Sequence, residues 1–298
     1  MVLAEKESNR MRNGQEQQKK QICQPQKEER QLYEERDWSK QLLPKLNCKK
    51  IRQQDFSQTV GTNGPVLLQD GILHEKLEQF VHRKPLERAV HVKGYGALGY
   101  FQLYQSMAEY TSAAFLQNPA AKTKILVRFS LAGSMRGAAD TSRDIRGFAV
   151  KFYTKAGIFD LVGNHIPVFF IHDAIKFPDT IAALSPSPVN NLPDPERFWG
   201  FVAQNPESLH MVVWLYSDWG TVKSFRHING HSVSTFVWKN LAGKRRLVKY
   251  HWLTMQGERC ISRQEAAKLA ASNPDVAGQE LYQALAQGES TRYQLCVQ

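Results

Sequence analysis

The sequence has few of the features that mark disulfide scaffolds, zinc clusters or membrane spans. Its four cysteines are widely spaced among 298 residues and form no CxxC pair, which argues against a disulfide-stapled fold, a zinc cluster or a redox dithiol. No apolar run approaches the roughly 20 residues of a membrane helix. The first 30 residues are polar and charged and lack the apolar segment of a secretory signal. These absences predict a cytoplasmic protein with reduced thiols and no membrane partner.

Basic residues outnumber acidic ones by 39 to 28, a net charge of +11 that raises the possibility of an anionic partner or cofactor. Residues 1–55 are rich in glutamine and mix acids with bases, whereas a nucleic-acid tail would carry denser Lys and Arg. We therefore expect no nucleic-acid partner. We expect residues 1–55 to form a polar N-terminal extension, and residues 56–298 to form the folded core.

Short runs rich in Val, Phe and Tyr, bounded by Gly, Asn or Asp, predict strands in two parts of the chain. Helical spacing predicts a short amphipathic helix at 71–84, short helices within 173–207 and two helices within 262–287. The pattern predicts an α+β protein, an antiparallel β scaffold with helical insertions. The predicted strands lie at 125–131, 147–153, 166–171, 209–218, 231–240, 247–255 and 291–298.

Two polar residues stand out as candidates for chemistry. His91 precedes a glycine-rich turn, and an imidazole titrates near neutral pH, so it is a candidate general acid and base, although a lone histidine is also often structural. Asn164 precedes a very apolar run and is either a turn former or a hydrogen-bond donor in an apolar pocket. The GxGxxG pattern at 94–99 is a weak nucleotide signal, because it continues into a strand-like run.

Arginines are concentrated between residues 128 and 146, among several aspartates. Such arginines either clamp the carboxylates of a ligand or brace loops through internal Arg–Asp pairs. For Arg143 and Arg146 the bracing role is the expectation.

Four segments in this order resemble the heme catalase family, and the similarity runs from about Gly64 to the last residue. They are LERAVHVKGYGALGYF, RFSLAGSMRGAADTSRDIRGFAVKFY, DLVGNHIPVFFI and PESLHMVVWLYSD. The resemblance implies an eight-stranded antiparallel β-barrel with helical insertions and an N-terminal arm. It also implies a bound heme b, the breakdown of hydrogen peroxide to water and oxygen, and a homo-oligomer.

Carried over by position, the resemblance implies three catalytic residues. His91 matches the distal histidine that moves a proton between the peroxide oxygens, Asn164 matches the amide that orients the peroxide, and Ser130 matches the serine that holds the imidazole. The implied heme-binding residues match propionate partners, aromatic residues at the porphyrin and the narrow part of the substrate channel. They are Arg88, Arg128, Phe169, Phe177 and Val90.

The sequence departs from the family pattern at several positions. The R-x-F-x-Y-x-D motif that supplies the axial tyrosine is absent, so the metal ligand stays unassigned. Tyr95 replaces a small residue and is expected to crowd or hydrogen-bond the pocket, and His165 replaces a second asparagine. Trp219 replaces an arginine that grips NADPH, so no NADPH is expected. The alternative interpretation is a truncated, noncatalytic catalase-like protein that acts as a binding or interaction module.

Overall fold

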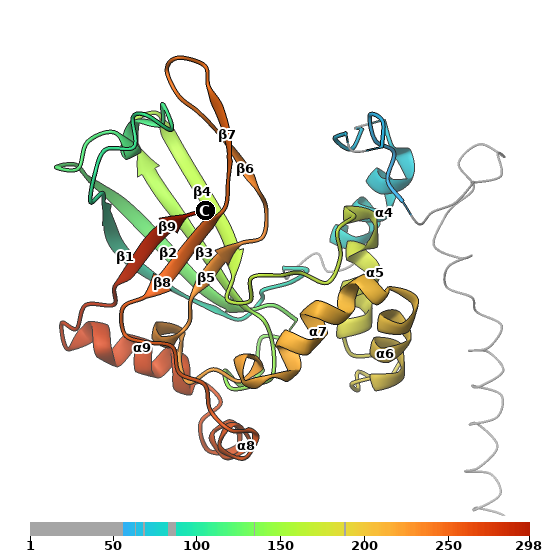
Figure 1. Cartoon of the computed structure of the whole chain (residues 1–298). Helices are drawn as coiled ribbons and strands as arrows, with labels where there is room; N and C mark the ends of the chain where they lie inside the picture. Colours follow the sequence, from blue (N-terminus) through green and yellow to red (C-terminus); the bar gives the residue numbers. More distant parts are fainter. Residues whose placement is uncertain (1–55, 63, 68, 83–87, 134, 188) are drawn as a thin grey trace, which may run out of the picture. The chain divides into compact units, whose positions relative to one another are not determined.

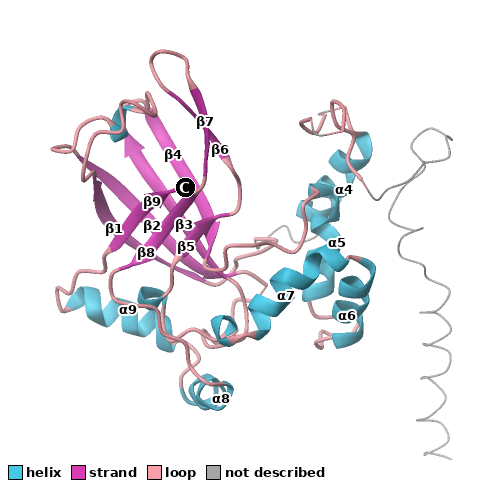
Figure 2. Ribbon diagram, in the orientation of Figure 1, coloured by secondary structure: helices cyan, strands magenta, loops and turns pink. Residues whose placement is uncertain are grey.

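The computed structural model describes residues 56–298, apart from 63, 68, 83–87, 134 and 188. The predicted polar extension, residues 1–55, lies outside the described residues. The described chain forms one strongly curled antiparallel sheet with helices at one end and beside it (Figures 1 and 2).

Seven strands form the sheet, in the order β1-β2-β3-β4-β5-β8-β9, and β6 and β7 form a separate two-stranded ribbon. The expected α+β class with an antiparallel scaffold is confirmed, with seven strands in the sheet where eight were expected. The strands are β1 (Gly94–Gln102), β2 (Lys122–Leu131), β3 (Arg146–Thr154), β4 (Gly157–Asn164), β5 (Gly230–Ser232), β6 (Phe236–Lys239), β7 (Arg245–Val248), β8 (Tyr250–Thr254) and β9 (Tyr293–Val297).

Alternate residues of the strands face the inside of the curl and form an aromatic core. Phe129 on β2 is paired in register with Phe148 on β3, and their rings meet edge to face with centroids 5.1 Å apart. Phe152 and Trp252 extend the same core. Because successive side chains of a strand point to opposite faces, the neighbours of these residues lie on the outer face. The candidate site is built on that outer face.

Helices occupy the predicted segments. The α-helices are α4 (Gly71–His82), α5 (Phe177–Leu184), α6 (Pro195–Gln204), α7 (Leu209–Tyr216), α8 (Arg263–Ser272) and α9 (Val276–Ala286), and the short 3₁₀ turns are η1 (Ala114–Leu116), η2 (Ala174–Lys176), η3 (Pro206–Ser208), η4 (Asp218–Gly220) and η5 (Phe225–His227). Asp194 caps α6 by accepting from Arg197 N, and Ser262 caps α8 by accepting from Glu265 N.

Two apolar runs that were predicted to be strands are not strands. The run at 209–218 contains helix α7, whose buried residues Met211, Val212 and Leu215 follow a helical spacing. The run at 166–171 is irregular, because Pro167 cannot donate a ladder hydrogen bond. Ile166 and Phe170 are buried instead in a second apolar cluster with α6 and α7.

Arg146 is fully buried and organises the loop between β2 and β3. It donates to the carbonyl oxygens of Asp140, Ser142, Asp144 and Gly220. Arg143 likewise donates to two carbonyl oxygens, those of residues 215 and 217. The expected bracing role therefore works through backbone carbonyls.

Candidate functional site

Three adjacent strands place the candidate polar residues in one row. Ser130 on β2 is in register with Gly147 on β3, and Gly147 is in register with Asn164 on β4. Neighbouring strands are about 4.8 Å apart, so Ser130 and Asn164 are separated by about 10 Å with only a glycine between them. The row therefore leaves room for another group over Gly147.

His91 fills part of this room from the segment that precedes β1. Its backbone is left-handed, with a φ of 58°, and its N–H donates to Ala132 O at 3.0 Å. Its Nδ1 lies 2.9 Å from Ser130 Oγ. A left-handed backbone is costly for a residue with a side chain, and such positions are concentrated at functional sites.

Gly147 is a residue of this arrangement that the sequence analysis did not select. A Cβ built on Gly147 would lie 2.4 Å from Ser130 Oγ and 2.7 Å from His91 Nδ1. Only glycine therefore lets the imidazole lie against β3. A glycine within a strongly apolar strand pattern was the signal that could have identified it.

The imidazole of His91 is held in its neutral form. Burial is the largest cause that lowers the pKa of His91, and together with the charges of Arg128 and Arg88 it brings this pKa to about 4. At neutral pH the ring thus has a lone pair available. When Nδ1–H donates to Ser130 Oγ, that lone pair is on Nε2. The geometry suits a base that accepts a proton and returns it.

Two of the predicted cofactor-binding residues provide positive charge beside His91. Arg128 Nη2 donates to His91 O at 2.7 Å, and burial together with the charge of Arg88 lowers the pKa of Arg128. In the described part of the chain neither guanidinium forms an ion pair with a carboxylate. Two neighbouring cations without an acidic partner suit an anionic ligand that carries carboxylates.

The other predicted heme-binding residues are a sequence neighbour of His91 and two aromatic residues at the second apolar cluster, the one that contains Ile166 and Phe170. Val90 directly precedes His91 and is half-buried. Phe169 and Phe177 stack with centroids 6.5 Å apart, and Phe169 belongs to the same apolar cluster as Ala132, whose carbonyl holds His91 N. The side chain of Asn164 is only 6% exposed and forms no hydrogen bond with another described residue.

Two residues expected beside the pocket have other roles. Tyr95 points into the curl, where its ring packs on Phe225 and its hydroxyl lies 3.2 Å from Asp275 Oδ1, so the expectation that it crowds the pocket was wrong. His165 is fully buried. Its Nδ1 accepts from Arg146 N, and its Nε2 lies 2.7 Å from Trp219 O. Both ring nitrogens of His165 are therefore occupied by the scaffold.

Across the described residues, no three His, Cys, Asp or Glu side chains are grouped in a way that could hold a metal ion. None of the described helices combines the length and the apolar character needed to cross a membrane.

Comparisons with known proteins identify the family of the chain. The Catalase family model matches residues 45–298. Catalase-2 of Bacillus subtilis is 46% identical over 253 residues, which are 84% of this chain and 37% of that protein. The catalase of Methanosarcina barkeri is 46% identical over 242 residues, which are 81% of this chain and 48% of that protein.

Solved structures give the same result. The crystal structure of a fungal catalase has a TM-score of 0.71 and 39% identity, and the match covers 83% of this chain and 50% of the fungal chain. The structure of a bacterial catalase has a TM-score of 0.70 and 40% identity, and the match covers 86% of this chain and 51% of the bacterial chain. The chain thus spans about half or less of the length of these relatives. With a matching family model over residues 45–298 and this level of identity, the chain belongs to the catalase family.

Proposed function

We propose that the protein takes part in the breakdown of hydrogen peroxide to water and oxygen, with heme b as its cofactor. The observation that carries the proposal is the neutral, half-buried imidazole of His91, which is held by Ser130 on the same sheet face as Asn164. The names of the relatives, which are catalases, support the same reaction class.

The proton chemistry follows from these three residues. His91 Nε2 accepts a proton from one peroxide oxygen and returns it to the other, which then leaves as water. Ser130 fixes the ring plane and the tautomer through Nδ1, so that Nε2 stays directed at the substrate. Asn164 donates from its amide to a peroxide oxygen and orients the bond. Overall, two peroxide molecules give two waters and one dioxygen.

The residues of this chain fit one side of a heme. Arg88 and Arg128 would pair with the propionate carboxylates, for which they have no competing acidic partner in the described chain, and Phe169, Phe177 and Val90 would provide apolar contacts. Heme iron, when bound, supplies the redox chemistry at the peroxide oxygens. The axial ligand stays unassigned, because the sequence contains no R-x-F-x-Y-x-D motif.

We also propose how the chain is divided into parts and how it assembles. Residues 56–298 would form the catalase-like core of a cytoplasmic homo-oligomer, and residues 1–55 its polar extension. Large apolar side chains on the outer sheet face support assembly with further surface, since Leu98 is 69% exposed and Val162 is 66% exposed.

The first test is an absorption spectrum of the full chain incubated with hemin, together with oxygen release from hydrogen peroxide. We expect a Soret band and oxygen release, and we expect His91→Ala to slow the release by about 100-fold or more, the usual loss for a general acid and base. His74→Ala, an exposed histidine on α4, is the matched control and should leave the rate unchanged.

A Soret band with oxygen release that His91→Ala does not slow would show that His91 has no role in the reaction. Absence of both the band and the oxygen from the folded chain would favour the noncatalytic binding module.

A further inference from the structure

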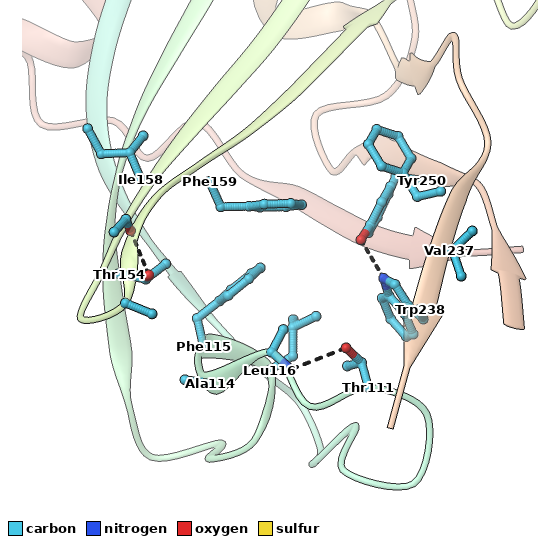
Figure 3. Close-up of a pocket in the computed structure, with 14 residues that line it drawn as sticks. Thr111, Ala114, Phe115, Leu116, Thr154, Ile158, Phe159, Val237, Trp238 and Tyr250 are labelled. Atoms are coloured by element: carbon cyan, nitrogen blue, oxygen red, sulfur yellow. Dashed lines mark hydrogen bonds between the residues drawn. The ribbon is translucent and has the colours of Figure 1, made fainter. Parts of the chain in front are cut away.

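A cavity with a volume of about 350 Å³ lies at the hairpin end of β3 and β4. Figure 3 shows the residues that line it. The β3–β4 hairpin, η1 and the β6 strand surround it. Seven residues of extended chain separate Gly147 from Thr154 at the hairpin, a distance of about 23 Å at about 3.3 Å per residue. The cavity is therefore separate from the site of His91.

Five of the fourteen residues that line the cavity are aromatic. Phe115 and Phe159 pack with centroids 5.4 Å apart and an interplanar angle of 38°, and Phe236 meets Tyr250 edge to face at 5.2 Å. Trp238 closes one side (Figure 3). None of the lining side chains is Lys, Arg, Asp or Glu, so the cavity favours a neutral and largely aromatic molecule.

One polar atom in the wall has an unused hydrogen-bonding capacity. Trp238 Nε1 lies 2.5 Å from Tyr250 Oη. Figure 3 marks this hydrogen bond with a dashed line. Because an indole N–H can only donate, the phenol oxygen is the acceptor, and its own hydroxyl proton is left over. In the described part of the chain no group accepts that proton, although Tyr250 is only 2% exposed.

The hydroxyl of Tyr250 stays protonated at neutral pH. Burial raises the pKa of Tyr250, and the hydrogen bond from Trp238 offsets only part of that effect. A buried donor without an acceptor is costly, and an acceptor supplied by a ligand would remove this cost.

We propose that this cavity binds a small neutral aromatic carbonyl compound. The aromatic ring of the ligand packs among Phe115, Phe159 and Trp238, and its carbonyl oxygen accepts the hydrogen bond from Tyr250 Oη. The volume is at the lower end of the range for small-molecule sites, which fits a molecule with a single ring.

The test compares two probes that differ in the carbonyl group. Binding of para-fluoroacetophenone and of para-fluoroethylbenzene to the full chain is measured by fluorine NMR titration. We expect saturable binding of both, with the ketone about 5-fold tighter, the effect of one ordinary hydrogen bond. Tyr250→Phe keeps the ring and removes the hydroxyl, so the two probes should then bind equally.

A second pair of variants locates the site. Ala114 is an exposed residue of η1 at the cavity rim, and Ala114→Trp should fill the cavity and abolish binding of both probes. Ala267→Trp adds the same side chain at an exposed position of α8 and should leave binding unchanged. These two variants and the two-probe comparison in the wild type keep the test valid if Tyr250→Phe does not fold.

Three results would overturn the proposal. They are no saturable binding to the folded wild-type chain, an unchanged preference for the ketone in folded Tyr250→Phe, and unaffected binding in Ala114→Trp. None of them depends on heme or on peroxide turnover, so the two proposals fail independently.

Discussion

At His91, a left-handed backbone and two strand residues fix the position of one imidazole ring. Ser130 holds Nδ1 from β2, and Gly147 leaves the space on β3 that the ring occupies. Burial and the two arginines then keep the ring neutral. The chemistry proposed for this residue thus depends on its neighbours having very small or hydrogen-bonding side chains.

The first prediction at this scale concerns Gly147. Gly147→Ala places a Cβ within 3 Å of both Ser130 Oγ and His91 Nδ1, which forces the imidazole outward. We expect the pKa of His91 to rise from about 4 toward its ordinary value of 6.5, because the ring becomes better solvated. NMR titration of the imidazole measures this pKa.

Gly96→Ala on β1 is the matched control. Its Cβ would lie 3.7 Å from the nearest side-chain atom, an ordinary contact, so the pKa of His91 should not change. A folded Gly147→Ala protein with an unchanged pKa of His91 would show that the strand glycine does not position the ring.

At this scale the sequence allowed residue types to be matched to roles but could not show their surroundings. Three separate segments that resemble the family indicated the histidine, the serine and the asparagine, whereas Gly147 and the left-handed backbone depend on how three strands meet. Tyr95 illustrates the limit, since one step along a strand moves a side chain to the opposite face. That step places Tyr95 in the aromatic core.

Among the elements, helix α9 is held at its first turn by a buried carboxylate from the β2–β3 loop. Asp140 Oδ2 accepts from Ala277 N and Gly278 N at 3.1 and 2.9 Å, and Asp140 pairs with Lys93 Nζ at 2.9 Å. Lys93 also pairs with Asp275 at 2.7 Å. A negative group at a helix N-terminus is favourable, and the buried lysine balances its charge.

We therefore predict that Asp140→Ala lowers the free energy of unfolding by about 3 kcal/mol, because it leaves Lys93 half-paired and two N–H groups without an acceptor. Urea unfolding measures the change. Asp275→Ala removes the exposed partner of the same lysine, a solvent-screened contact, and should cost clearly less than Asp140→Ala. Equal losses in the two variants would contradict the role of Asp140 as the buried anchor.

Element prediction from the sequence succeeded where periodicity was clear and failed where apolar residues were continuous. The two helices split by Asn273 and Pro274 were predicted correctly. The run at 209–218 is apolar at most positions, so its period was not recognised in the sequence. It forms helix α7, and Met211, Val212 and Leu215 become the buried face only because they pack in the cluster that includes residues of α6.

For the molecule as a whole, three histidines, of which His165 is buried and His91 and His231 are half-buried, share a property that links folding to acidity. The pKa is lowered to about 4 in His91, about 3 in His165 and about 4 in His231. Burial is the largest cause in each, and Arg128, Arg146 and His251 respectively act in the same direction. An unfolded chain has an ordinary histidine pKa near 6.5. Between pH 6.5 and 4 the unfolded chain therefore binds more protons than the folded one.

It follows that the free energy of unfolding should fall as pH drops from 7 to 5, by up to about 1.4 kcal/mol per pH unit for each such histidine. Urea midpoints across this interval measure the slope. His231→Asn should reduce the slope, and His74→Asn, at an exposed position, should not. A midpoint that is constant from pH 7 to 5 would contradict the prediction.

The strand order has a consequence for how the molecule folds. Strands β1 to β4 pair strictly with their neighbours in the sequence, whereas β5, β8 and β9 are separated along the chain by helices and by the β6–β7 ribbon. Sequential pairing closes short loops and is fast, while distant pairing is slow. Ser130, Gly147 and Asn164 lie on β2, β3 and β4, which all pair with strands next to them in the sequence. We therefore expect β1 to β4 to pair early in folding, before β5, β8 and β9 join the sheet.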